Sequence, residues 1–192
     1  MSGDMDRKGF LTRAGLVAGA ASVPGLLTAE AAFGQHGHGT SRIYDFVSFS
    51  QAPASGHIAQ PRIGMRGCGN FDETAKRVDG GGSFFFFDNA QPVPKPLIVF
   101  GRWRATTFVS YDTKGLASYG PVQPGILELL ADLEGFGSGL TLEVICNVGP
   151  AGLSTGEEEG WQLRGTPYGD FMPLDPPLGI THLSAPGFSI PA

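Results

Sequence analysis

The sequence is poor in the residues and patterns that mark metal centres, nucleic-acid binding and membrane spans. It contains two cysteines and four histidines among 192 residues, whereas a structural zinc site usually needs four such ligands close together. Lysine and arginine number 13 and form no cluster, so nucleic acid is not an expected partner. An uncharged segment, residues 14–27, is too short and too rich in glycine and alanine for a stable membrane span, which needs about 20 apolar residues.

The first 31 residues contain the three parts of a secretion signal. A basic start at Arg7-Lys8 is followed by the uncharged segment 14–27 and then by Ala29-Glu30-Ala31, an A-x-A cleavage pattern. We therefore expect an exported protein, periplasmic or extracellular, with cleavage after Ala31. A surface amphipathic helix is the alternative, but no polar face repeats along this segment.

The beginning of this segment resembles the twin-arginine (Tat) signal peptide of bacteria. Arg7, Gly9, Phe10 and Leu11 match its pattern, and Lys8 stands where the second arginine belongs. The resemblance implies Tat export, in which a protein crosses the membrane already folded. The general secretion route is the alternative.

Composition predicts a single domain made of short strands. Cleavage after Ala31 would leave 161 residues (192 minus 31), enough for one domain with a real core. Residues 32–41 are interpreted as a flexible linker and residues 42–192 as the domain. The 30 glycines and 15 prolines are scattered along the chain as turn residues, which is typical of many short strands.

About eight strands are expected in this domain. The segment 126–134 fits a helical spacing as well as a strand, and its length between glycines favours a strand. Residues 72–82, which end in three glycines, are interpreted as a polar turn, and residues 97–112 as a long strand that bends near Arg104. With no strand–helix alternation, the fold class is all-β: a single β-sandwich, jelly roll or small barrel. The expected strands are 43–50, 62–71, 83–88, 97–112, 126–134, 140–148, 160–164 and 180–184.

Four consecutive phenylalanines, Phe84 to Phe87, form the most unusual run in the sequence. Successive side chains of a strand point to opposite faces, so both faces are aromatic here. Leaving two of these rings in water would forgo about 2 kcal/mol each, so a second layer should cover them. A central strand, a subunit interface and an apolar ligand pocket are the alternatives. Phe85, Phe87 and Trp103 are the candidate ligand-binding residues.

The two cysteines, Cys68 and Cys146, are the candidate pair for a disulfide, which an exported protein can hold. Strand alternation instead predicts that the two cysteines point to opposite faces of the sheet and stay unpaired. Cys146 shares a face with four apolar residues of its segment and should point inward. Cys68 shares a face with Arg62 and Arg66 and should point outward, unless a bulge resets the register.

Catalytic and metal motifs are weak. Residues 152–156 match G-x-S-x-G around Ser154, and Asp170 or Asp175 and then His182 follow in hydrolase order, but the helix and parallel sheet of a hydrolase are not expected. No catalytic residue and no cofactor is therefore assigned. His36 and His38 in the linker are candidate metal ligands, and the acidic loop 157–159 is a candidate for calcium or simply a solvated loop.

Two further resemblances concern the domain. Residues 78–89 and 144–156 resemble segments of exported bacterial proteins of unassigned function. The glycine-rich pattern at 67–71 and 80–84 resembles the hairpins of the allene oxide cyclase and dirigent family. That resemblance implies a β-barrel, often a homo-oligomer such as a trimer, that holds a small apolar ligand.

Three functions remain open at this point. The first is an exported non-catalytic β-domain with a binding or assembly role. The second is a cofactor-free barrel enzyme, an isomerase or cyclase acting on a small apolar substrate, with residues 84–87 and Trp103 lining its cavity. The third is a weak metal-binding exported protein that uses His36 and His38.

Overall fold

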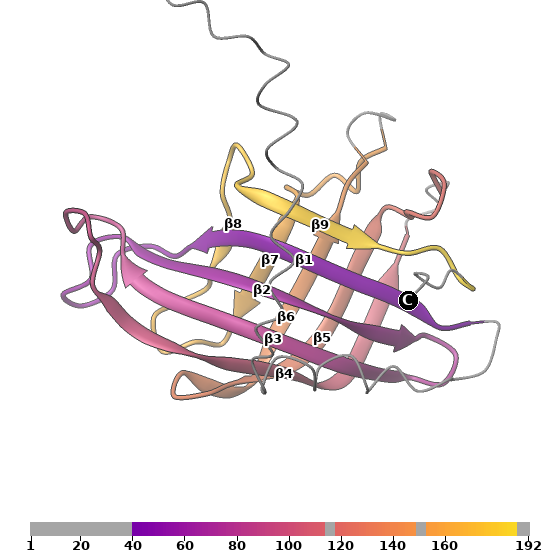
Figure 1. Ribbon diagram of the computed structural model, residues 1–192, viewed down its shortest axis with the longest axis horizontal. Coiled ribbons are helices and arrows are strands. Elements are labelled where there is room, and N and C mark those ends of the chain that lie inside the picture. The colour runs from indigo at the N-terminus through magenta and orange to yellow at the C-terminus, as the bar shows by residue number, and fades with distance from the viewer. Residues whose placement is uncertain (1–39, 114–117, 149–152, 188–192) are drawn as a thin grey trace, which may run out of the picture. The chain divides into compact units, whose positions relative to one another are not determined.

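The computed structural model describes residues 40–113, 118–148 and 153–187, and all the regular structure in these residues is β. This confirms the expected all-β class with about eight strands (Figure 1). No helix in the described residues is long and apolar enough to cross a membrane. The strands are β1 (Arg42–Gln51), β2 (Pro61–Asp72), β3 (Arg77–Asp88), β4 (Leu97–Asp112), β5 (Gly125–Leu133), β6 (Gly137–Cys146), β7 (Gly160–Arg164), β8 (Met172–Pro173) and β9 (Gly179–Leu183).

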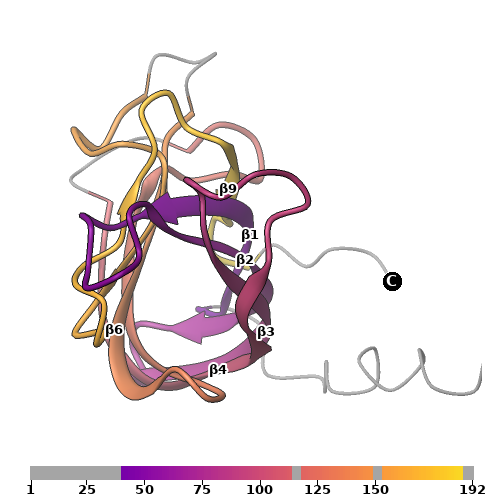
Figure 2. The ribbon, with the colours of Figure 1, turned by 90° about the vertical axis from the view of Figure 1, so that its left-hand side faces the viewer.

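The strands form one antiparallel sheet that curls into a nearly closed barrel (Figure 2). Strands β1 to β7 pair in chain order, each with the next. The short segment around β8 joins the two ends of this meander: Phe171 pairs with Leu163 of β7, and the next two residues pair with the end of β1. β9 pairs with the first part of β1. Of the three all-β architectures expected from the sequence, the small barrel is therefore the one formed.

Side chains complete the barrel where the ends of the meander meet. The Ser50 hydroxyl of β1 donates to the carbonyl of Trp161 in β7 at 2.6 Å, and the Trp161 indole N–H donates to the Ser48 carbonyl at 3.2 Å. Farther toward the start of β1, where β9 pairs with it, the Thr181 hydroxyl of β9 donates to the Ile145 carbonyl of β6 at 2.6 Å. Side-chain hydroxyls and an indole thus satisfy polar groups that a continuous ladder would have paired.

The ambiguous segment 126–134 is a strand. Leu127, Leu129, Ala131 and Leu133 of β5 are buried, and the residues between them are half-buried. Period-two burial of this kind is what a strand with one face on the core requires. The helical alternative is therefore excluded.

The expected turn over residues 72–82 is too long: residues 73–76 form a turn, but Arg77 to Gly82 belong to β3. Gly67 and Gly69 of β2 lie opposite Gly82 and Gly80 of β3 in an unbroken register. Three of them approach interior aromatic side chains: a β-carbon on Gly67 would meet the Trp103 ring, and one on Gly69 or Gly80 would meet the hydroxyl of Tyr44, at 2.4 Å for Gly80. Glycine inside a strand marks such a close approach as well as a turn, and here it makes room for interior aromatic rings.

Aromatic rings fill the barrel. Phe84 and Phe86 of β3 are fully buried in the interior. The ring of Phe86 contacts Tyr168 at 4.6 Å and Phe171 at 6.0 Å between centroids, so the loop before β8 covers one end of the core. Each fully buried phenylalanine contributes about 1.5–3 kcal/mol relative to an exposed one, which makes this cluster a main source of stability.

Candidate functional site

Apolar side chains gather on the outside of the barrel over β1 to β4. Phe49, Gly64, Phe85 and Phe100 lie side by side in one row across these four strands. Phe49 and Phe85 meet edge to face, with centroids 5.7 Å apart. Phe100 at the end of the row is 69% exposed. We call the outward-facing apolar residues of this region the aromatic face; it comprises Val47, Phe49, Phe85, Phe87, Leu97, Ile98 and Phe100.

Gly64 shapes the centre of the aromatic face. A β-carbon at this position would lie 2.4 Å from the ring of Phe85 and 3.0 Å from the ring of Phe49. The Phe85 ring therefore lies against the bare backbone of β2, an arrangement in which an aromatic side chain covers a cross-strand glycine. Beside it is a shallow groove of about 110 Å³, which Val47 and Arg66 also line.

The four-phenylalanine run divides as strand geometry predicts. Phe84 and Phe86 enter the core, while Phe85 and Phe87 lie on the aromatic face. The Phe85 and Phe87 rings stack with centroids 5.8 Å apart, and Phe87 is almost completely covered. Phe85 keeps part of its ring in water. The aromatic run thus supplies both the core and a surface.

Three arginines border the aromatic face. Arg66 of β2 and Arg102 of β4 lie in the next row, with Ser83 between them, and both are exposed. Arg62 of β2 lies on the opposite side of the Gly64 row, in the row that contains Phe87. Its guanidinium donates a hydrogen bond to the side chain of Gln51. Within the described residues, none of the three arginines forms an ion pair. The face therefore combines apolar side chains with three arginines, and the Glu134 carboxylate lies beside one of them, where it accepts a hydrogen bond from the backbone N–H of Arg102 at 3.1 Å.

The loop between β3 and β4 extends this surface beyond the sheet. Val93, in the middle of the loop, is 85% exposed. The Lys95 ammonium group donates to the carbonyls of Asn89 and Gln91, at 2.6 and 2.7 Å. These bonds fix the loop in a single shape that holds Val93 out in water. Figure 2 shows the loop standing out from the barrel wall beside β3 and β4.

Asp88 fixes the base of the same loop. Its carboxylate accepts hydrogen bonds from the backbone N–H groups of Gln60, Ala90 and Ala59 and from the side chain of Gln91. Burial would raise the pKa of Asp88, but the four hydrogen bonds outweigh it and lower the pKa to about 2. The charged carboxylate thus ties the β1–β2 loop to the β3–β4 loop.

The candidate ligand-binding residues are not brought together. Phe85 and Phe87 lie on the outer face, whereas Trp103 lies inside the barrel. The Trp103 ring stacks on Phe46 with centroids 5.6 Å apart, and its indole N–H donates to the Arg66 carbonyl at 2.9 Å. The position of Trp103 is that of a core residue.

The cysteines are both free and lie on opposite faces of the sheet. Cys146 is buried inside the barrel, where its thiol donates to the Thr181 carbonyl at 3.4 Å, and Cys68 is exposed. The candidate disulfide is therefore not formed, for the reason that strand alternation gave. Burial raises the pKa of Cys146 to about 11. Burial and the nearby Asp45 carboxylate also raise the pKa of Cys68.

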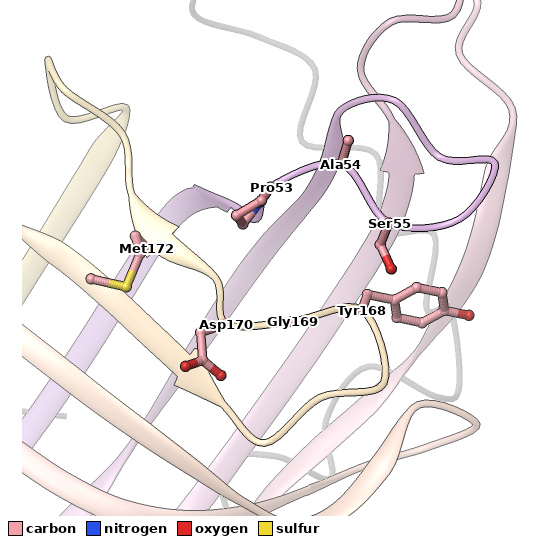
Figure 3. A pocket seen from close by; sticks show the side chains of 7 residues that line it. All are labelled: Pro53, Ala54, Ser55, Tyr168, Gly169, Asp170 and Met172. Carbon is pink, nitrogen blue, oxygen red and sulfur yellow. The ribbon is translucent and has the colours of Figure 1, made fainter.

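An open cleft lies at the end of the barrel that Tyr168 covers (Figure 3). It has a volume of about 470 Å³ and is formed by the chain after β1 and the loop before β8. Ser55, Tyr168 and Asp170 are its polar side chains (Figure 3). The Asp170 carboxylate accepts a hydrogen bond from the backbone N–H of Gly165 at 3.1 Å, so it holds its own loop together.

The candidate hydrolase and metal-binding motifs do not form a site in the described residues. The Ser154 hydroxyl accepts a hydrogen bond from the N–H of Gly156, two residues on, as serines do in local turns. His182 is on β9, opposite Asp45 of β1. Across the three described segments, no three His, Cys, Asp or Glu side chains lie close enough to hold a metal ion. His36, His38 and the signal-like segment lie outside the described residues.

Sequence reasoning missed the aromatic face because its members come from separate segments. Phe49, Phe85 and Phe100 become neighbours only through the register of β1 to β4. The signal that could have found it is Gly64, a glycine inside a strand and between the apolar Ile63 and Met65. Comparisons with protein-family models, curated proteins and solved structures find no match to this chain.

Proposed function

We propose that this protein is an exported, non-catalytic β-barrel that acts in binding or assembly through its aromatic face. The observation that carries the proposal is the row of Phe49, Phe85 and Phe100 on the outside of the barrel, bordered by arginines that form no ion pair among the described residues. Contiguous exposed apolar surface is a cost to a monomer in water and marks an interaction site.

The contrast with the interior supports this assignment. Trp103, Phe84 and Phe86, which a barrel enzyme would need around a substrate, are buried against other side chains of the core. Exposed aromatic rings and arginines are the residue types that anchor interfaces. The charged start and A-x-A pattern of the first 31 residues support the export part of the proposal.

The proposal is tested by complementation of a strain that lacks the chromosomal copy of the gene. A variant with alanine at Ser154, Asp170 and His182 should restore the phenotype fully, whereas Phe100→Ser should not. Val109→Ser is the matched control, because Val109 is an exposed apolar residue of the same strand far from the aromatic face. Circular dichroism of each purified variant establishes that it is folded.

Two outcomes would overturn the proposal. One is loss of complementation by the folded triple-alanine variant, which would point to chemistry at those residues. The other is full complementation by Phe100→Ser, and also by Phe100→Glu, which would show that the aromatic face is not used.

A further inference from the structure

The most exposed apolar residues lie in the β3–β4 loop and at the adjoining end of the aromatic face, and we call this region the protrusion. Val93 stands at the middle of the β3–β4 loop, and Leu97, Ile98 and Phe100 follow it at the start of β4, all of them exposed. The Phe86–Phe87 step of β3 meets a register shift at this point, which places both Leu97 and Ile98 at the surface.

The protrusion is held in place rather than loosely attached. Asp88 binds the backbone at its base, and Lys95 binds two of its carbonyls. Three prolines, at 92, 94 and 96, further restrict the loop. Because the apolar side chains are presented in water by a rigid loop, little conformational entropy remains to be lost when they are buried.

The charge around the protrusion is positive although the whole chain is negative. The chain carries a formal net charge of -5, yet Arg62, Arg66 and Arg102 border the exposed apolar residues. Lys95 adds a fourth cation within the loop itself. Three carboxylates lie near these cations: Asp88 accepts hydrogen bonds from backbone N–H groups at the base of the loop, Glu134 accepts one from the backbone N–H of Arg102, and Asp45 lies near Arg66 around Cys68. The complementary surface is therefore both apolar and anionic.

Charge complementarity separates the possible partners. A second copy docked so that the arginine-bearing edges of the two faces meet would place like charges together, which disfavours that arrangement. Nucleic acid would use aromatic rings for stacking, but Val93, Leu97 and Ile98 are aliphatic and have no such use there. An anionic phospholipid surface takes aliphatic and aromatic side chains below its headgroups and cations at its phosphates.

We propose that the partner of the aromatic face is the surface of an anionic phospholipid membrane. Val93, Leu97 and Phe100 enter the interfacial region, and Arg66 and Arg102 contact lipid phosphates. This inference rests on the proposed binding role of the aromatic face and names its partner. It describes a protein that lies on a membrane and does not span it.

The size of the expected effects follows from general values for a cation near an anionic leaflet and for a buried aromatic ring. Each arginine near an anionic leaflet contributes about 1 kcal/mol, so removing one should weaken binding about fivefold. Arg66→Gln with Arg102→Gln should therefore weaken it about 25-fold. Phe100→Ser removes one ring that enters the interface and should weaken it about tenfold. Salt at about 1 M, where the Debye length is about 3 Å, should remove most of the arginine contribution.

The test is flotation of the purified protein with lipid vesicles. One set of vesicles contains phosphatidylcholine with about 30 per cent of the anionic lipid phosphatidylglycerol. Vesicles of pure phosphatidylcholine serve as the uncharged comparison. All variants are prepared in the same way and share the same N-terminus, so any effect of residues 1–39 is equal in all samples. Val109→Ser is again the matched apolar control and should bind like the unmodified protein.

Binding to the anionic vesicles only, lost on Phe100→Ser and on the double arginine change, is the expected result. Equal binding to both vesicle types, no binding to either, or binding that survives these changes would overturn the inference. Sedimentation equilibrium in parallel gives the oligomeric state. Self-association that is lost on Phe100→Ser would assign the face to a second copy and also overturn it. If vesicle binding fails while Phe100→Ser still fails to complement, the proposed binding role stands without a lipid partner.

Discussion

The substitution Gly67→Ala tests the packing of Trp103 inside the barrel. A β-carbon on Gly67 would lie 2.2 Å from Cζ2 of Trp103 and 2.8 Å from the carbonyl oxygen of Gly81. Carbon atoms in contact are normally about 3.5–4 Å apart, so one of these groups must move. The Trp103 ring cannot swing aside freely, because it stacks on Phe46 and donates to the Arg66 carbonyl.

The expected loss of stability follows from these contacts. Overpacking a core costs about 1–3 kcal/mol. Breaking the indole hydrogen bond adds about 0.5–1.5 kcal/mol. Alanine recovers about 0.5–1 kcal/mol of the backbone entropy that glycine loses in a strand. The net loss is therefore about 2 kcal/mol, which corresponds to a fall in Tm of about 4–8 °C for a domain of this size.

The assay is urea denaturation followed by far-ultraviolet circular dichroism, carried out as a double-mutant cycle. Trp103→Phe removes the atoms that the new β-carbon would meet, so Gly67→Ala should cost at least 1 kcal/mol less in that background. Gly137→Ala is the control: its β-carbon would meet only the end of the Leu140 side chain, at 3.1 Å, and should change stability by less than about 0.5 kcal/mol. An equal cost of Gly67→Ala in both backgrounds would refute the proposed contact.

Two further predictions concern titratable groups. The pKa of Asp88 is about 2 in the folded protein and about 3.9 in the unfolded chain. The stabilisation of the folded state by the charged carboxylate is therefore complete above about pH 4 and is lost as the pH falls toward 2. Asp88→Asn should therefore lower the urea midpoint at pH 7 but not at pH 2. An equal lowering at pH 7 and at pH 2 would contradict the expected direction of this pH dependence. At pH 7.5, iodoacetamide should modify Cys68 in the folded protein and Cys146 only after unfolding, since burial raises the pKa of Cys146 to about 11. Mass spectrometry distinguishes these products, and a disulfide-linked Cys68–Cys146 peptide would contradict the two free thiols of the structure.

Local alternation was enough to predict much of the fold. In β5 and β6 every second residue is apolar, so the strands and their inward faces follow from the sequence. The same rule placed Cys146 inside and Cys68 outside. The aromatic and β-branched composition of residues 97–112 predicted the bounds of β4, and the expected strand 160–164 agrees with β7.

What the sequence did not predict depends on pairing between distant strands. The three glycines at 80–82 look like a turn until β2 lies beside them and Tyr44 needs the space. β8 has two residues, too few to show any period, and exists because it links β7 to β1. The aromatic face and its arginines arise from the register of four strands, which no local pattern contains.

The hydroxyl and indole contacts that complete the barrel also set the order in which the chain can fold. Neighbouring strands from β1 to β7 pair through short connections, so those hairpins can form early. The contacts of Ser50 with Trp161 and of Ser48 with Trp161 join residues more than 100 positions apart and have to wait for the rest. Until then β1 keeps an open edge, which another chain could pair with. If the chain were exported before the Trp161 contacts covered the edge of β1, another chain could pair with that edge. If it were exported already folded, the edge would be covered.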